Sequence, residues 1–180
     1  MDLVLIGDIT STAYKITFFL NILAVIVGIG VTFWYGVYGM KSKQLGESGD
    51  AAGSASIAAA NVFVSHKAEL VILTIPLFGV GMVMMSDDVW TFGQTWVWLA
   101  LVVFAAAFAM ANLVLAPLAK RIAALTAEMA AMGPPPAGAA GPPPQVAELD
   151  AVGKRLGMFS GIVHLMLFTL LYLMIWKPGL

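Results

Sequence analysis

The most constraining feature of this sequence is a set of four long stretches that contain no charged side chain. They hold 25 residues between Lys15 and Lys41, 17 between Glu69 and Asp87, 31 between Asp88 and Lys120, and 21 between Arg155 and Lys177. At about 1.5 Å per residue, helices of these lengths reach about 25 Å or more, comparable with a hydrocarbon core of about 30 Å. We therefore predict four transmembrane helices, at residues 16–40, 68–86, 96–117 and 157–176.

Composition supports a membrane protein, because 61% of the residues are hydrophobic, only 11% are charged, and the mean hydropathy is +0.93. The predicted fold is all-α: one polytopic membrane domain over residues 1–180 that forms a four-transmembrane-helix bundle. A net charge of −1 predicts no nucleic-acid partner, and the absence of cysteine excludes disulfides and thiolate metal sites. The first span is not predicted to be a cleaved signal peptide, since its flank carries Asp2 and Asp8 without a basic residue.

The distribution of basic residues predicts the orientation. The two long loops hold seven Lys and Arg residues, while the opposite side holds two. The seven are Lys41, Lys43, Lys67, Lys120, Arg121, Lys154 and Arg155, and the two are Lys15 and Lys177. By the positive-inside rule we predict a multi-pass protein of the bacterial inner (plasma) membrane, with both long loops cytoplasmic and both termini non-cytoplasmic.

The long loops differ in composition. Residues 41–56 end in small and polar residues, which predicts a flexible cytoplasmic linker followed by a helix that Ser54 or Ser56 caps. Residues 118–156 have apolar residues at helical spacing, interrupted by two triple-proline blocks within 133–144. They predict a cytoplasmic helical hairpin whose arms are joined by a stiff proline-rich connector.

Two patterns bear on helix packing. Pro76 lies inside the second span and predicts a kink there. The fourth span begins with Gly153, Gly157 and Gly161, a small-residue repeat that allows close approach between helices. This stripe has two interpretations, packing against the first span or formation of a homodimer.

Polar residues inside a bilayer are costly and are therefore functional candidates. His66, Glu69, Asn112 and His164 are predicted at a similar depth in the inner half of the spans, whereas Asn21 lies in the outer half of the first span. Three hypotheses compete for this inner polar cluster. The four side chains join helices through hydrogen bonds, or His66 and His164 bind haem or a metal, or Glu69 and the histidines form a proton or substrate relay.

No reaction is indicated by the remaining residues. Asp87 and Asp88 are adjacent carboxylates in a short turn, which favours a solvated turn over a hard-cation site because such sites need more oxygen ligands. The sequence has no nucleophile–base arrangement, phosphate loop or dinucleotide fingerprint. We predict no catalytic residue and no metal site, and haem enters only as the alternative above.

Four segments carry a resemblance to a known family: LNILAVIVGIG (20–30), SDDVWTFGQTWVWL (86–99), PPPQVAELDAVGKRL (142–156) and WKPG (176–179). They resemble a bacterial family of predicted four-span integral membrane proteins classed as a domain of unknown function (DUF2269), over nearly the whole chain. The pattern is more remotely similar to membrane bundles of the copper-resistance D and protoporphyrinogen-oxidase type, some of which hold haem. Those bundles often have a first-span histidine where this chain has Asn21, so the resemblance transfers no catalytic residue.

These observations predict a non-enzymatic subunit or scaffold of a larger membrane assembly, respiratory or transport, with the lipid bilayer as its surroundings. A homodimer or a larger complex is the predicted state of association. One alternative function is a haem-binding or redox protein that uses His66 and His164. Another is a small transporter that works through the kink at Pro76.

Overall fold

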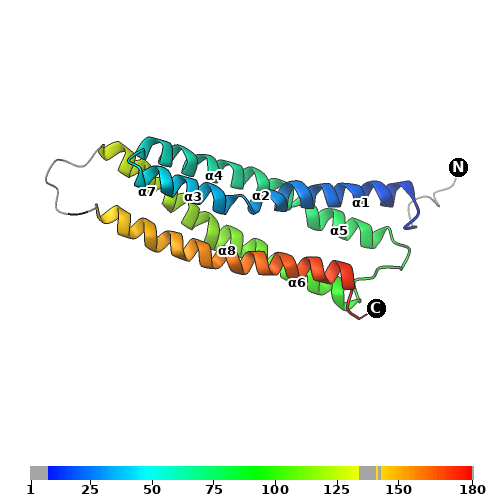
Figure 1. The fold of residues 1–180 in the computed structure, drawn as a ribbon. Coiled ribbons are helices and arrows are strands. Elements are labelled where there is room, and N and C mark those ends of the chain that lie inside the picture. The colour runs from blue at the N-terminus through cyan, green and yellow to red at the C-terminus, as the bar shows by residue number, and fades with distance from the viewer. Residues whose placement is uncertain (1–7, 134–140, 142, 180) are drawn as a thin grey trace. The chain divides into compact units, whose positions relative to one another are not determined.

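The structure is a computed structural model, and it describes residues 8–133, 141 and 143–179. Its elements in chain order are α1 (Thr12–Ala24), η2 (Val25–Ile29), α2 (Gly30–Thr32), α3 (Tyr35–Glu47), α4 (Ala51–Ile72), α5 (Thr74–Met84), α6 (Thr95–Met110), η3 (Ala111–Leu115), α7 (Ala116–Met132) and α8 (Pro144–Trp176) (Figure 1). The two η elements are π-helical turns within longer helices. These elements join into four helices long and apolar enough to cross a membrane, at Thr12–Glu47, Ala51–Met84, Thr95–Met132 and Pro144–Trp176. The prediction of an all-α protein with four spans is confirmed.

The chain divides into two compact units. Unit 1 comprises residues 1–32, 67–107 and 165–180, and unit 2 comprises residues 33–66 and 108–164. The π-helical turn η2 ends three residues before the first boundary, and η3 begins three residues after the boundary at 107. Local breaks in the helical hydrogen-bond ladder therefore accompany the division.

Unit 1 is built on close packing at small residues. Its helices α1 and α5 lie side by side (Figure 1). A Cβ at Gly28 would lie 2.9 Å from Ile72 Cγ1 and 3.2 Å from the Ile72 backbone nitrogen, so this glycine sets how closely η2 approaches α4. A Cβ at Gly81 would lie 3.7 Å from Thr17 Cγ2, an ordinary contact. Close approach of helices at small residues is the usual packing mode where lipid removes the hydrophobic driving force.

In unit 2, residues 41–56 form two helices and a tight turn in place of the predicted flexible linker. Gly49 has φ of 88°, and the Asp50 N–H donates to Leu45 O at 2.9 Å, which is the Schellman arrangement that ends α3. Asp50 Oδ1 then accepts the Gly53 N–H at 2.8 Å and caps α4, so neither Ser54 nor Ser56 is the cap.

Ser54 instead joins the two helices of this turn. Ser42 Oγ donates to Ser54 O at 2.9 Å and lies 3.1 Å from Ser54 Oγ, and both serines are buried. The small side chains let α3 and α4 approach closely (Figure 1). The glycine and serine content that suggests a linker therefore serves a compact helical hairpin.

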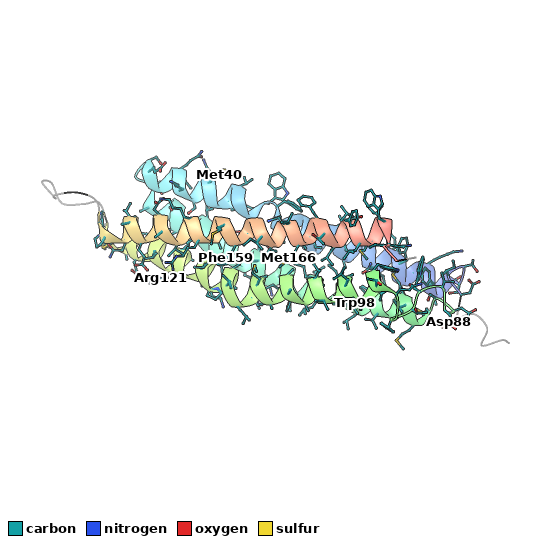
Figure 2. The ribbon with its side chains drawn as sticks, turned by 90° about the horizontal axis from the view of Figure 1, so that it is seen from below. Met40, Asp88, Trp98, Arg121, Phe159 and Met166 are labelled. Carbon is teal, nitrogen blue, oxygen red and sulfur yellow. The ribbon has the colours of Figure 1, made fainter. Side chains whose placement is uncertain are left out.

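The other part of unit 2 consists of α7 and the first turns of α8. Leu125 of α7 is fully buried, and Thr126 beside it donates to its own helix at Ile122 O. Arg121 on α7 (Figure 2) forms a forked pair with Glu148 on α8, with Nε to Oε1 at 2.8 Å and Nη2 to Oε2 at 2.9 Å. The two arms of the predicted hairpin are thus joined, while most of the predicted connector at 133–144 lies outside the described residues.

The second span is interrupted near Pro76. Helix α4 ends at Ile72 and α5 begins at Thr74, with Leu73 as a turn between them. Pro76 lacks the N–H that would bond to Ile72 O, and its ring crowds that carbonyl. The Thr74 hydroxyl donates to Val71 O at 2.7 Å, so a side chain supplies a donor at the interruption.

Candidate functional site

His164 has the most distinctive polar environment in unit 2. Its Nδ1 lies 2.7 Å from Ser160 O, four residues earlier on α8. A carbonyl can only accept, so this contact requires a proton on Nδ1, and in the neutral ring the lone pair then lies on Nε2. Nε2 is buried and has no partner within the described chain, and the ring lies 4.7 Å from that of Phe33. A ring oriented in this way leaves Nε2 available to a metal ion.

Asn112, His66 and Glu69 are the other members of the predicted inner cluster. Asn112, in η3, donates from Nδ2 to Phe108 O at 3.0 Å, which lies on its own helix. No hydrogen bond joins Asn112 to His164 in the part of unit 2 that the structure describes. His66 and Glu69 lie three residues apart on α4, with His66 exposed and Glu69 half-buried. Asn112 and His164 thus each bond to a backbone carbonyl of their own helix.

Asn21 is the most buried of the predicted polar candidates. It is 3% exposed in unit 1, and its Oδ1 has no hydrogen-bond partner among the described residues. An unsatisfied buried amide oxygen costs about 1–3 kcal/mol. The residue lies one turn before η2, where the helical ladder changes register.

The glycine stripe on α8 is open within its unit. A Cβ added at Gly153, Gly157 or Gly161 would meet no heavy atom within 4 Å in the described chain. Gly157 and Gly161 are exposed and Gly153 is half-buried. Packing of this stripe on the first span, or on a second copy of the chain, stays a prediction.

At one end of unit 1, Trp90 and Trp96 lie at a turn whose aromatic residues the sequence predicts as an interfacial belt, and the structure adds Lys177 to them. Lys177 Nζ lies 3.8 Å from the centroid of the Trp90 ring and 5.6 Å from that of Trp96. Trp90 Nε1 donates to the Tyr14 hydroxyl at 3.1 Å, and the Trp90 and Trp96 rings meet edge to face at 5.5 Å. Burial lowers the pKa of Lys177 from its ordinary value of 10.5, while the ring faces attract its charged form.

The turn that supports this aromatic cluster is organised by Ser86, which is fully buried. Ser86 Oγ lies 2.8 Å from Val83 O and accepts the Trp90 N–H at 3.0 Å. The next two residues, Asp87 and Asp88, have φ of 51° and 61°, in the left-handed region that side-chain-bearing residues rarely adopt. In the sequence this cluster is visible only as Trp90, Trp96 and Lys177. Trp96 and Lys177 lie 81 residues apart.

No group of three or more His, Asp or Glu side chains in the described residues could hold a metal ion. Asn112 and His164 each bond to a carbonyl of their own helix, whereas Trp90 and Lys177 meet at one end of unit 1. The fold and these groups together define an α-helical integral membrane protein with four spans.

Comparison with known families identifies the family to which the chain belongs. Residues 15–178 match the family described as predicted integral membrane protein (DUF2269), and the chain belongs to that family. The predicted family resemblance is therefore confirmed. No curated protein and no solved structure matches the chain.

Proposed function

We propose that this protein is a non-enzymatic subunit or scaffold of a larger respiratory or transport assembly in the membrane, and that partner proteins assemble on unit 2. The observation that carries the proposal is the forked Arg121–Glu148 pair, which ties α7 to α8 at charged positions. Both arms also continue beyond the predicted spans. Held together in this way, they form an ordered helical surface for protein partners.

Helix length supports a surface of this kind. The four apolar helices have 33 to 38 residues. At about 1.5 Å per residue they are about 50–57 Å long, against about 30 Å of hydrocarbon. Each helix is therefore long enough to cross the hydrocarbon and continue by several turns.

The charge distribution supports the sidedness of the proposal. Seven of the nine Lys and Arg residues lie in the two long loops. This bias favours a cytoplasmic location for both loops and for the α7–α8 arms, with the termini on the other side of the plasma membrane. Accordingly, the assembly surface faces the cytoplasm.

The test measures the size of the complex in mild detergent extracts of native membranes. The wild-type chain is expected in a discrete assembly larger than the chain alone. Arg121→Glu is expected to weaken that assembly, and the double variant Arg121→Glu/Glu148→Arg to restore it. The swapped pair Lys43→Glu/Glu47→Lys is the matched control, because these residues form an exposed pair within α3, at 3.9 Å. A wild-type protein that migrates as a single chain would overturn the proposal.

A second function, haem or metal binding, is favoured by His164 alone. The Ser160 carbonyl orients the ring through Nδ1, and the buried Nε2 lacks a partner in the described chain. These features fit an axial haem ligand, because such a histidine is oriented through one ring nitrogen and binds iron through the other. His66, on α4, is the candidate for the second ligand.

An absorption spectrum of the purified protein, with and without dithionite, tests this second function. A Soret band that shifts on reduction and disappears in His164→Ala would support it. Asn112→Ala is the control, since Asn112 bonds only to its own helix. A wild-type spectrum without a Soret band, after expression with haem precursor, would exclude haem, and metal analysis of the same sample would decide for metals.

A further inference from the structure

Basic residues occur in close pairs on three helices of unit 2. The pairs are Lys41 with Lys43 on α3, Lys120 with Arg121 on α7, and Lys154 with Arg155 on α8. One member of each pair meets a carboxylate within the protein, at 3.9, 2.8 and 2.7 Å. These ion pairs are Lys43–Glu47, Arg121–Glu148 and Lys154–Asp150. The other member of each pair has a different environment.

Three exposed side chains, here named the free cations, are those of Lys41, Lys120 and Arg155. They form no ion pair or hydrogen bond within the part of the chain that the structure describes. No Asp or Glu lies three or four residues before or after any of them, so the usual pairing along a helix is not available. Lys41 follows Met40 and Lys120 precedes Arg121, both labelled in Figure 2.

Each free cation stands at the end of an exposed apolar stripe on its own side of the helix. The stripes run through Trp34 and Tyr38 to Lys41, through Leu113 and Pro117 to Lys120, and through Ile162 and Met158 to Arg155. Their members follow one another at three-to-four spacing. In a membrane protein such a stripe faces lipid, and a cation at its end lies where the lipid headgroups begin.

The contact between Phe33 and His164 places two of the free cations at a similar level. The two rings lie 4.7 Å apart, and these residues are the first and the last of unit 2 in their spans. Lys41 lies eight residues from this contact and Arg155 nine, which corresponds to about 12 and 14 Å. Lys120 lies twelve residues into unit 2 on the third span, or about 18 Å, and long basic side chains reach over such differences.

We propose that the free cations bind the phosphate groups of anionic lipids, of the phosphatidylglycerol class, in the leaflet that surrounds unit 2. The lipid phosphate supplies the negative charge that these side chains lack within the described chain. The acyl chains of the same lipid cover the apolar stripe that leads to each cation. A soluble anion would match the charge alone, so the combination favours a lipid. The inference does not rest on the scaffold function.

Native mass spectrometry of the full-length protein in a neutral detergent tests this proposal. The protein is titrated with phosphatidylglycerol or with phosphatidylcholine of identical acyl chains, and the bound lipids are counted at each concentration. We expect phosphatidylglycerol to bind more tightly, and we expect this preference to decrease as salt is added, because the free cations are exposed.

Variants separate the free cations from basic charge in general. Lys41→Gln/Arg155→Gln is expected to weaken phosphatidylglycerol binding about fivefold at each site and to leave phosphatidylcholine binding unchanged. Lys43→Gln/Lys154→Gln is the matched control, because it removes the same charge from the same two helices at residues that already have carboxylate partners. Lys120→Gln tests the third site, and circular dichroism checks that each variant folds.

The proposal fails if the wild-type protein binds both lipids equally, or if the matched control loses as much affinity for phosphatidylglycerol as Lys41→Gln/Arg155→Gln. Displacement of the lipid by glycerol 3-phosphate at the same concentration would assign the free cations to a soluble phosphate compound and would overturn the choice of a lipid. All variants keep Arg121 and Glu148, and the protein is purified away from other chains. Failure of this test therefore leaves the assembly proposal unaffected, and the reverse also holds.

Discussion

Unit 1 and unit 2 are stabilised internally by different kinds of contact. Unit 1 relies on close contacts at small residues, such as Gly28 against Ile72, and on the aromatic cluster around Trp90. Unit 2 uses a buried serine pair, a fully buried leucine and the forked Arg121–Glu148 pair. Lipid gives apolar side chains no reason to gather, so shape and polar contacts at the ends must hold unit 1. The forked ion pair and the buried leucine of unit 2 are contacts that also occur between helices in water.

The largest expected effect is that of Leu125→Ala in unit 2. The side chain is fully buried, so its removal leaves a cavity and should lower the free energy of unfolding by about 2–5 kcal/mol. Unfolding in detergent followed by circular dichroism measures this change. Met132→Ala on the same helix is the control, since Met132 is 53% exposed. Equal effects of the two variants would show that burial of Leu125 does not stabilise unit 2.

A smaller effect is expected from Gly28→Leu in unit 1. Any Cβ there would approach the Ile72 side chain and backbone too closely, and overpacking of this kind costs about 1–3 kcal/mol. Gly30→Leu is the matched control two residues later, because no heavy atom lies within 4 Å of a Cβ at that position. If Gly30→Leu were as harmful as Gly28→Leu, helix propensity rather than close packing would explain both losses.

Asn21→Leu should change the stability of unit 1 in the opposite direction. The substitution removes a buried amide oxygen without a partner in the described chain and keeps a similar volume. We expect the free energy of unfolding to rise by about 1 kcal/mol, measured by tryptophan fluorescence during unfolding in detergent. Asn112→Leu is the comparison, since it breaks an existing bond to Phe108 O and should not stabilise. A loss of stability in Asn21→Leu would mean that Oδ1 has a partner, such as a bound water.

The smallest expected effect is a pH dependence specific to unit 2. The hydrogen bond from Arg121 lowers the pKa of Glu148 from its ordinary value of 4.5, so the folded state favours the charged carboxylate. Its contribution to stability is therefore complete above pH 4.5 and is lost as the pH falls through the lowered pKa. The pair is exposed, so the change should be small and should decrease with salt.

Glu148→Gln provides the control for this pH effect. Its unfolding midpoint should fall less than that of the wild type between neutral and acidic pH, at low salt. The carboxylate of Asp150 also has a pKa lowered by Lys154, so some dependence should remain in the variant. Identical pH profiles of the two proteins would show that the forked pair does not stabilise unit 2.

Much of the fold could be predicted because uncharged stretches between residues such as Lys15 and Lys41 report directly on burial in lipid. The end of α7 at Met132 likewise follows from the Gly133 and proline signals. The α3–α4 turn was harder, since small and polar residues occur both in flexible linkers and in close helix contacts such as Ser42 with Ser54. The Asp50 cap and Gly49 were the readable signals of that turn.

The candidate sites could be predicted less well. His164 was identifiable as a polar residue within a predicted span, but the orientation of its ring depends on the contact of Nδ1 with the Ser160 carbonyl, which the structure shows. The contact between Lys177 and Trp90 joins residues 87 positions apart, and no local pattern encodes it. Long-range pairs of this kind depend on how whole helices pack.

The continuity of α8 has a mechanical consequence. The other three apolar helices are interrupted, whereas α8 runs from Pro144 to Trp176 as one α-helix. The interruptions are the Val25–Ile29 and Ala111–Leu115 π turns, the turn at Phe33 and Trp34, and the turn at Leu73. A rod with an intact ladder of backbone bonds resists bending more than rods with local defects. Thermal fluctuation should then concentrate at these four interruptions, and backbone amides there should exchange with heavy water sooner than those in the middle of α8.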